Sequence, residues 1–163
     1  MPRPSATAAP ELAILIGFPG AGKSTFYADR LAATHAHVSK DAMPRSSDKR
    51  ARQRRLLETA LRDGRSAAVD NVNATRAERA ELIAIAADAG ARVVGYWLDA
   101  PPALCLGRNG ERSGAARVPP VAIFAAAKRF EPPTAAEGFA ALWRVRPAGT
   151  CEAPSFELAP LAS

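Results

Sequence analysis

The sequence predicts an α/β fold in which a parallel sheet of about five strands carries helices on both faces. Short apolar runs alternate along the chain with longer segments of helical periodicity, and this alternation is typical of parallel strands joined by crossover helices. The first run, residues 12–16, is continuously apolar and stops at Gly17, as a strand buried on both faces does. Asp41, Asp70 and Asp99 follow three later runs. We therefore expect ligands at one edge of the sheet, beyond the carboxyl ends of the strands.

Apolar periodicity and turn residues define the individual elements. The expected strands span residues 12–16, 36–38, 67–69, 93–98 and 141–145. The expected helices span residues 23–33, 49–62, 75–89, 101–106 and 120–129. Thr75 is the expected N-cap of the third helix, because Glu78 stands three residues later and completes a capping box. Residues 107–118, rich in glycine and arginine, are expected to form a loop. We expect a flexible leader at 1–10, one domain at 11–146 and a C-terminal tail at 147–163.

Composition indicates a single globular domain. The chain has 163 residues, of which 48% are hydrophobic and 23% charged, a balance that excludes a disordered chain. No apolar stretch reaches the roughly 20 residues of a membrane span and no signal peptide is recognisable, so a cytoplasmic protein is expected. The two cysteines match no metal-binding spacing. The net charge of +6 suits a polyanionic partner such as a nucleic acid.

Residues 17–25 read GFPGAGKST and match the phosphate-binding pattern G-x-x-x-x-G-K-[ST] in full. Glycines let the backbone wrap closely, so that several N–H groups point at phosphate oxygens, and the helix that follows adds its dipole. In this pattern the lysine, Lys23, reaches the β- and γ-phosphates and the Ser24 hydroxyl binds Mg²⁺. A dinucleotide-binding fold would need G-x-G-x-x-G, which the sequence lacks. The residues expected to bind ATP are Gly17, Pro19, Gly20, Ala21, Gly22, Lys23, Ser24 and Thr25.

The size of the chain and its late arginine-rich loop resemble the small P-loop kinases, which close a lid over the phosphates. Asp41 follows the second predicted strand, on the same sheet edge as the phosphate loop. A kinase needs a carboxylate in such a place to accept the proton of the attacking hydroxyl. The alternative interpretation is that Asp41 only caps the turn that follows it.

Five segments, in this order, resemble the kinase domain of polynucleotide 5′-hydroxyl kinases, the end-healing enzymes of nucleic acid repair. They are IGFPGAGKSTF (Ile16–Phe26), VSKDAM (Val38–Met43), AVDNVN (Ala68–Asn73), the loop Arg108–Pro119 and RFEPPTAAEGF (Arg129–Phe139). The resemblance extends over residues 12–146. The phosphate loop alone is generic, whereas its Phe-Pro-Gly version, the aspartate at the strand end and the FEPPTAAEGF segment are specific in combination.

The resemblance implies a role for several residues. The aspartate that matches Asp41 is the general base, and the one that matches Asp70 organises the acceptor site and the surroundings of the metal. Lid arginines clamp the phosphates; Arg112 matches the principal one and Arg108 a second. Asp70, Arg45 and Asn73 are thereby assigned to acceptor binding. For the two lid arginines the alternative is a solvated loop without a catalytic role.

The chain departs from this family at three points. Lys40 stands before the aspartate where the family commonly has arginine. The family's arginine for the acceptor phosphate falls at Pro44, with Arg45 one position further. The phosphatase domain that is often fused to the kinase is absent from this sequence. If Arg45 cannot reach the acceptor phosphate, a different acceptor is implied.

Basic residues crowd the start of the second helix, just after the proposed base: Lys49, Arg50, Arg52, Arg54 and Arg55. Such a cluster can follow the backbone of a strand whose 5′ end lies at Asp41; the alternative is a solvated helix face. His35 and His37 flank a short strand and are expected to be structural.

Taken together, the residues predict an ATP- and Mg²⁺-dependent kinase that transfers the γ-phosphate to the 5′-hydroxyl of a nucleic acid. A kinase of the same fold acting on a small metabolite or antibiotic hydroxyl is the first alternative. A non-catalytic ATP-binding module is the second. The sequence leaves open DNA or RNA as acceptor, the preferred donor nucleotide and the oligomeric state, and it indicates no obligate protein partner.

Overall fold

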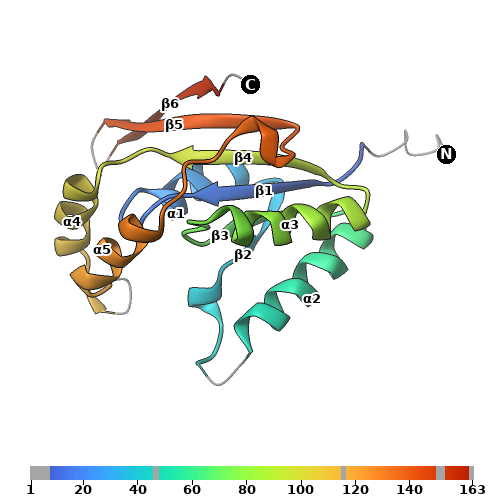
Figure 1. Ribbon diagram of the computed structural model, residues 1–163, viewed down its shortest axis with the longest axis horizontal. Helices are drawn as coiled ribbons and strands as arrows, with labels where there is room; N and C mark the ends of the chain where they lie inside the picture. The colour runs from blue at the N-terminus through green and yellow to red at the C-terminus, as the bar shows by residue number, and fades with distance from the viewer. Residues whose placement is uncertain (1–7, 46–47, 115–116, 150–152, 162–163) are drawn as a thin grey trace.

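A computed structural model describes residues 8–45, 48–114, 117–149 and 153–161. Within these residues one sheet of six strands has the order β2-β3-β1-β4-β5-β6 (Figure 1). The strands are β1 (Glu11–Ile16), β2 (His35–Val38), β3 (Ser66–Asp70), β4 (Arg92–Leu98), β5 (Ala141–Gly149) and β6 (Pro154–Pro160). The first five are parallel and β6 is antiparallel to β5. The predicted α/β fold with a mostly parallel sheet is confirmed, with one strand more than expected.

Helices cover both faces of the sheet. They are α1 (Lys23–Phe26), which continues as a π-helical turn (Tyr27–Leu31), α2 (Lys49–Arg62), α3 (Arg76–Asp88), α4 (Pro102–Gly110) and α5 (Pro120–Arg129). One apolar core joins α2 and α3 to the sheet. A second core joins α1, α4 and α5 to the opposite face. The carboxyl end of β1 points toward the side on which α4 and α5 lie (Figure 1), so these two helices stand beside the ligand edge.

The central strand β1 shows why the sheet forms. Leu12, Ile14 and Ile16 are fully buried in the core beneath α2 and α3, whereas Ala13 and Leu15 are fully buried in the other core. Alternate side chains of a strand point to opposite faces, and a continuous apolar run therefore serves both cores. Each of the large side chains stabilises the fold by about 1.5–3 kcal/mol relative to an exposed position.

Two segments differ from the sequence prediction. Residues 107–110 belong to α4 and not to a loop, and residues 154–160 of the expected tail form the edge strand β6. Prolines 154 and 160 stand at the two ends of this strand, and an edge strand tolerates proline because one of its sides makes no ladder hydrogen bonds. Phe156 on β6 is buried against Phe26, with the ring centroids 5.2 Å apart. The predicted leader falls mostly outside the described residues.

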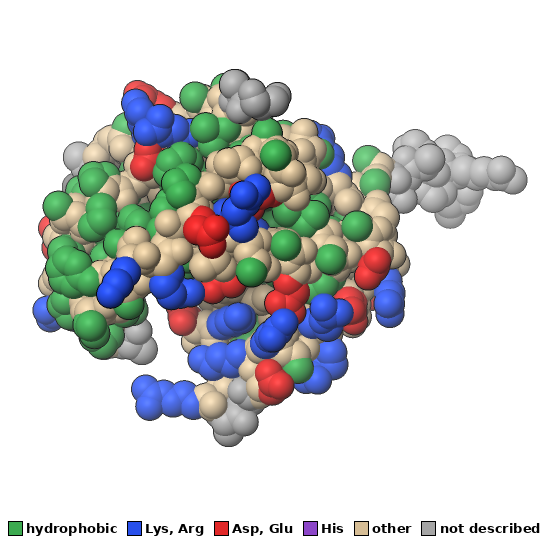
Figure 2. Space-filling view, in the orientation of Figure 1, with side chains coloured by type: hydrophobic (Ala, Val, Ile, Leu, Met, Phe, Trp, Pro, Cys, Tyr) green, Lys and Arg blue, Asp and Glu red, His purple; other side chains and the backbone are tan. Residues whose placement is uncertain are grey.

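The molecular surface is hollowed on the face shown in Figure 2, between the region of α4 and α5 and the region of α2. Side chains of Lys or Arg and of Asp or Glu lie around this hollow (Figure 2). None of the helices in the described ranges is long and apolar enough to cross a lipid bilayer.

Candidate active site

The phosphate loop lies between β1 and α1, at the centre of the sheet edge. Gly20 and Gly22 have φ values of +87° and +100°, a backbone region that favours glycine. A Cβ atom on Gly20 would lie 2.6 Å from the carbonyl oxygen of Cys105 in α4. Helix α4 therefore rests directly on the loop, an arrangement that tolerates no side chain at Gly20.

Lys23 is buried inside the loop. Its ammonium group donates hydrogen bonds to the carbonyl oxygens of Gly17 (2.8 Å) and Phe18 (3.0 Å). Burial lowers the pKa of Lys23 to about 8, although the nearby carboxylates of Asp70 and Asp41 oppose this change, whereas Arg112 adds to it. Asp41, Asp70 and Arg112 come from three distant parts of the chain, and each lies close enough to Lys23 to influence its pKa.

Asp70 forms the centre of a small polar group next to Lys23. Its Oδ2 atom accepts hydrogen bonds from the Ser24 hydroxyl (2.7 Å) and from His37 Nε2 (2.8 Å). The imidazole of His37 packs on the Tyr27 ring, with centroids 4.4 Å apart. His37 was expected to be structural; its contact with Asp70 places it beside the reactive edge, which its position in the sequence did not indicate.

The pair formed by Ser24 and Asp70 fits a magnesium ion. Both side chains offer hard oxygen atoms, and Mg²⁺ in nucleotide sites is held by one or two such protein ligands together with phosphate oxygens and water. No cluster of three or more His, Cys, Asp or Glu side chains suited to a metal occurs in the described part of the chain. The residues at hand would therefore hold Mg²⁺ together with a triphosphate, and not in a closed protein cage.

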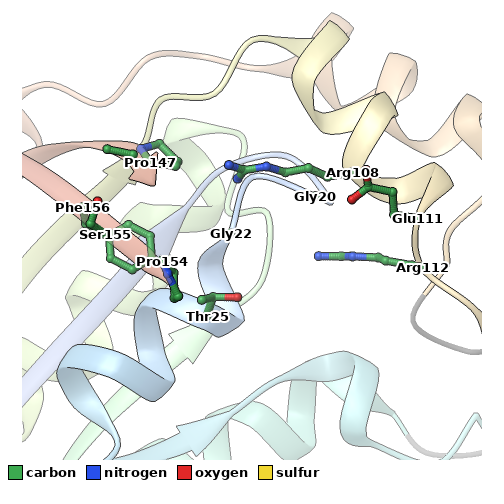
Figure 3. A pocket seen from close by; sticks show the side chains of 11 residues that line it. Gly20, Gly22, Thr25, Arg108, Glu111, Arg112, Pro147, Pro154, Ser155 and Phe156 are labelled. Carbon is green, nitrogen blue, oxygen red and sulfur yellow. The ribbon is translucent and has the colours of Figure 1, made fainter. Parts of the chain in front are cut away.

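A cavity of about 350 Å³ adjoins the phosphate loop on the side of β5 and β6 (Figure 3). Its walls include Gly20 and Gly22 of the loop, Arg108 of α4 and Arg112 just after it, and Pro147 and Phe156 of the last two strands. The side chains of Arg108 and Arg112 extend from the lid toward the loop (Figure 3). We call this cavity the donor pocket. The sequence analysis anticipated its loop and its arginines but not the wall from β5 and β6.

Asn109 holds the lid segment in place. It is 2% exposed; its amide nitrogen donates to the carbonyl oxygen of Val118 (2.7 Å), and its amide oxygen accepts from the Val118 N–H (2.9 Å). The two ends of the segment that carries Arg112 are thus joined. No sequence signal pointed to Asn109, because its partner is nine positions away across an aperiodic stretch.

Asp41 lies on a short 3₁₀ turn (Lys40–Ala42) after β2 and is exposed. The turn is attached to the end of β3, since the Lys40 N–H donates to the side-chain oxygen of Asn71 (3.0 Å). The Asn71 amide in turn donates to the side-chain oxygen of Gln53 in α2 (2.7 Å). A polar pocket of about 180 Å³ opens here, which we call the acceptor-side pocket; its walls include Lys40, Gln53, Asn71, Glu78, Glu81 and Arg129.

Of the other residues that were assigned to acceptor binding, Asn73 lines the acceptor-side pocket, whereas Arg45 and Asp70 are not among its wall residues. Asn73 is buried with φ +48°, and its amide nitrogen donates to the Leu15 carbonyl (2.7 Å), so the side chain ties the loop after β3 to β1. Arg45 is exposed after the 3₁₀ turn. The contacts of Asp70 are to Ser24 and His37, as described above. Acceptor binding by Arg45, Asn73 and Asp70 stays a prediction.

The four arginines of the basic cluster on α2 divide into two pairs. Arg50 donates to both carboxylate oxygens of Glu81 (2.9 and 3.1 Å), and Arg54 lies 3.9 Å from the same carboxylate. Arg52 and Arg55 are exposed, and neither forms an ion pair with another described residue. The available positive charge on this helix therefore belongs to Arg52 and Arg55 more than to Arg50 and Arg54.

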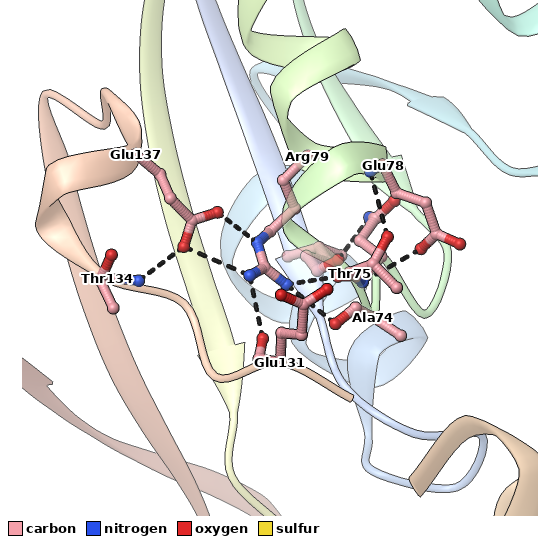
Figure 4. Close-up of polar contacts among 9 residues, drawn as sticks. Ala74, Thr75, Glu78, Arg79, Glu131, Thr134 and Glu137 are labelled. Atoms are coloured by element: carbon pink, nitrogen blue, oxygen red, sulfur yellow. Dashed lines mark hydrogen bonds and ion pairs between the residues drawn. The ribbon is translucent and has the colours of Figure 1, made fainter. Parts of the chain in front are cut away.

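Arg79 joins α3 to residues 130–139, the segment FEPPTAAEGF (Figure 4). This guanidinium is fully buried and donates to both oxygens of Glu137 (2.7 and 3.2 Å). It also donates to the carbonyl oxygens of Asn73, Ala74 and Glu131 at 2.9–3.1 Å. The predicted capping box of Thr75 and Glu78 is confirmed at the same helix end. The junction thus fixes the loop after Asp70, which the sequence analysis did not foresee.

Comparison with known proteins agrees with this geometry. Residues 12–133 match the family model described as AAA domain. Among solved structures, a fungal RNA kinase has a TM-score of 0.66 at 13% identity, with 85% of this chain and 38% of that chain covered. Kti12 from Chaetomium thermophilum, in complex with ADP-AlF3, has a TM-score of 0.61 at 16% identity, with 83% and 88% covered. A gluconokinase from Sinorhizobium meliloti 1021 has a TM-score of 0.59 at 18% identity, with 85% and 83% covered.

These similarities show the P-loop kinase fold. The chain spans little more than a third of the fungal RNA kinase but most of the other two proteins. The names RNA kinase and gluconokinase differ in the acceptor that they indicate, so the fold alone does not select an acceptor.

Proposed function

The chain belongs to the family described as AAA domain, and we propose that it is an ATP-dependent phosphotransferase whose acceptor is the 5′-hydroxyl of a nucleic acid. One observation carries the transferase part of this proposal. The lysine of the phosphate loop, the carboxylate of Asp41 and the guanidinium of Arg112 come from three separate segments and share one electrostatic neighbourhood. A nucleotide-binding module without transfer has no need of a carboxylate at the acceptor position.

Each side chain has a defined task in the proposed reaction. Lys23 leaves its two carbonyl partners and binds the β- and γ-phosphate oxygens. Arg112 holds the transferred group from the lid side, where its planar fork of donors suits phosphate. Asp41 accepts the proton of the acceptor hydroxyl as its oxygen attacks the γ-phosphorus in line with the departing ADP oxygen. Ser24 and Asp70 would hold Mg²⁺, which would supply positive charge against the negative charge of the triphosphate.

The choice of a nucleic acid acceptor is supported by charge and by shape. Arg45, Arg52 and Arg55 are exposed in the segment that follows Asp41, and the hollow between the α2 region and the α4–α5 region is open to solvent (Figure 2). A strand whose 5′ end reaches Asp41 can lay its phosphates along these side chains. The resemblance to polynucleotide 5′-hydroxyl kinases over most of the chain agrees with this choice.

A second acceptor class, a small molecule with a free hydroxyl, is favoured by one specific observation. Two of the five residues of the basic cluster are already paired with carboxylates, Arg50 with Glu81 and Arg54 with Glu58 and Glu81. Together with proline at position 44, this pairing leaves the immediate neighbourhood of Asp41 poorer in phosphate ligands than the family pattern implies.

Transfer of labelled γ-phosphate tests the proposal. The protein is given ATP, Mg²⁺ and a panel of acceptors: 5′-hydroxyl oligonucleotides of DNA and RNA, nucleosides, and small sugars and alcohols. We expect labelled oligonucleotides, and we expect Asp41→Asn to lower the rate by about 10²- to 10⁴-fold while ATP binding is retained. Lys23→Ala serves as the inactive control. If only small compounds are labelled, the acceptor is a small molecule and not a nucleic acid. If ATP is hydrolysed and no acceptor is labelled, the proposed transferase activity is wrong.

A further inference from the structure

The acceptor-side pocket is attached to the turn that carries the proposed base. Lys40, which precedes Asp41, forms part of its wall, and Asn71, which follows Asp70, forms its floor through the hydrogen bond to the Lys40 N–H. The pocket lies on the α2–α3 side of the sheet edge and shares no lining residue with the donor pocket. With about 180 Å³ it is smaller than the roughly 300–1,000 Å³ typical of sites for drug-sized ligands, so it suits one small group.

Gln53 brings an unused hydrogen-bond donor to this pocket. The residue is 7% exposed, and its side-chain oxygen accepts from Asn71. Its amide nitrogen makes no hydrogen bond to any other described residue, although no fully buried side-chain nitrogen or oxygen among them lacks a partner. The nitrogen therefore reaches the open space of the pocket. An accessible amide donor at a pocket wall, held in place through its own side-chain oxygen, is available to a ligand with an acceptor atom.

The charges around the pocket are balanced. Glu78 is paired with Arg129 (2.9 Å) and Glu81 with Arg50 (2.9 Å). Each carboxylate keeps further lone pairs that can accept hydrogen bonds from a ligand. The wall carries two carboxylates and two cations, Lys40 and Arg129, so it has no excess positive charge for a phosphate group. A neutral group with both donors and acceptors meets a partner for each. A hydroxyl group combines both functions in one atom.

We propose that the acceptor-side pocket binds a neutral, hydroxyl-bearing sugar ring, with the Gln53 amide as donor and the carboxylates of Glu78 and Glu81 as acceptors. This inference rests on the proposed phosphotransferase function, since it names the part of the acceptor that is held beside Asp41. Two sources present the same chemistry: the terminal nucleoside of a nucleic acid, and a free sugar or polyol. In either case the phosphates of the acceptor lie outside this pocket.

Ligand-observed saturation-transfer NMR tests the pocket without requiring transfer. The protein is saturated with ADP and Mg²⁺, and the probes are adenosine, deoxyadenosine, ribose, glucose and inorganic phosphate. We expect at least one sugar-bearing probe to bind, and we expect Gln53→Leu to weaken its binding by about two- to tenfold, the range of one missing hydrogen bond. Glu81→Gln, a second variant of the same size, should weaken the same probe. Arg62→Gln, an exposed change on the same helix, is the matched control and should leave binding unchanged.

The outcomes separate the two sources and the two proposals. Binding of the nucleosides alone identifies a terminal nucleoside, and binding of a free sugar alone identifies a small acceptor; both support the pocket. The inference is overturned if no sugar-bearing probe binds, if binding is the same in Gln53→Leu and Glu81→Gln as in the parent protein, or if inorganic phosphate competes for the pocket. Sugar binding without transfer to any acceptor would reject the proposed function and leave the pocket assignment standing.

Discussion

Arg79 and Arg112 place the same guanidinium group in two contrasting regions. Arg79 is fully buried, and every one of its five N–H donors has a carbonyl or carboxylate partner within the fold. Arg112 is half-buried at the wall of the donor pocket and extends toward the phosphate loop (Figure 3). An arginine whose N–H donors are all bonded within the fold, such as Arg79, has a structural role. An arginine at a pocket wall, such as Arg112, can reach a ligand.

Replacing Arg79 should have the largest effect, and it should act on stability. Arg79→Met leaves Glu137 buried without its guanidinium partner, and breaking a buried pair in this way typically costs about 3–5 kcal/mol. We expect the free energy of unfolding, measured with denaturant, to fall by about that amount. The double variant with Glu137→Met should recover part of the loss, because no unpaired charge then remains. A loss below about 1 kcal/mol in the single variant would contradict the structural role of the junction.

Replacing Arg112 should act on turnover and spare stability. Arg112→Ala removes a donor to the transferred phosphoryl group, and the loss of one such donor typically lowers kcat by about 10²- to 10³-fold. Arg112→Lys should restore only part of the rate, since an ammonium group cannot reproduce the fork. Arg117→Ala, an exposed change in the same segment, is the control for both. If the transfer assay gives an unchanged kcat for Arg112→Ala, the segment that carries Arg112 does not take part in catalysis.

Lys23 is a third case, a buried cation held by carbonyl groups. With a pKa near 8, the side chain of the free protein is charged below that pH and loses its proton above it. Triphosphate binding favours the charged form and raises the pKa. The affinity for ATP should therefore be constant below about pH 8 and should weaken by about tenfold for each pH unit above it. Titration with a fluorescent ATP analogue from pH 6.5 to 9.5 measures this effect, and Lys23→Met should show a flat profile.

The smallest effects are expected on the surface of α2, where the comparison between paired and unpaired arginines can be made within one helix. Changing Arg52 and Arg55 to Gln should raise KM for an oligonucleotide and lower the salt dependence of binding, by about one in slope for each phosphate that the protein no longer binds. The same change of Arg50 and Arg54 is the matched control and should do less, because these two arginines are already paired with Glu81 and Glu58. Equal effects of the two double variants would show that the ion pairs open when the acceptor binds.

The phosphate loop and the order of strands along the chain could be predicted from the sequence because both depend on local patterns. Gly17, Gly22, Lys23 and Ser24 are near neighbours in the chain, and a strand buried on both faces has an unbroken apolar run. The same is true of the capping box at Thr75, whose partner is three residues away. The place of Asp41 just beyond the end of β2 followed from the same reading of strand ends, since parallel strands have their carboxyl ends at one edge; its role toward an acceptor stays a prediction.

The predicted roles of the arginines were less secure, because residue type does not reveal burial. Nothing in the spacing of Arg79 separates it from the exposed arginines of α2. Its partner Glu137 is 58 positions away, on a segment whose motif indicated a function and whose glutamate holds the fold together. Likewise, Glu81 lies 31 positions from Arg50, so the division of the basic cluster into two pairs could not be anticipated.

What the sequence by itself determined is the chemistry of the loop, the α/β class and the edge at which ligands gather. Only the tertiary structure decided which charges remain available there: it buried Arg79, attached Asp70 to Ser24 and His37, neutralised Arg50 and Arg54, and turned Gln53 toward an open pocket. The physical reason is that the free energy of a charged or polar group depends on its solvation and on its partners. Both are set by residues that are distant in the chain and adjacent only after folding.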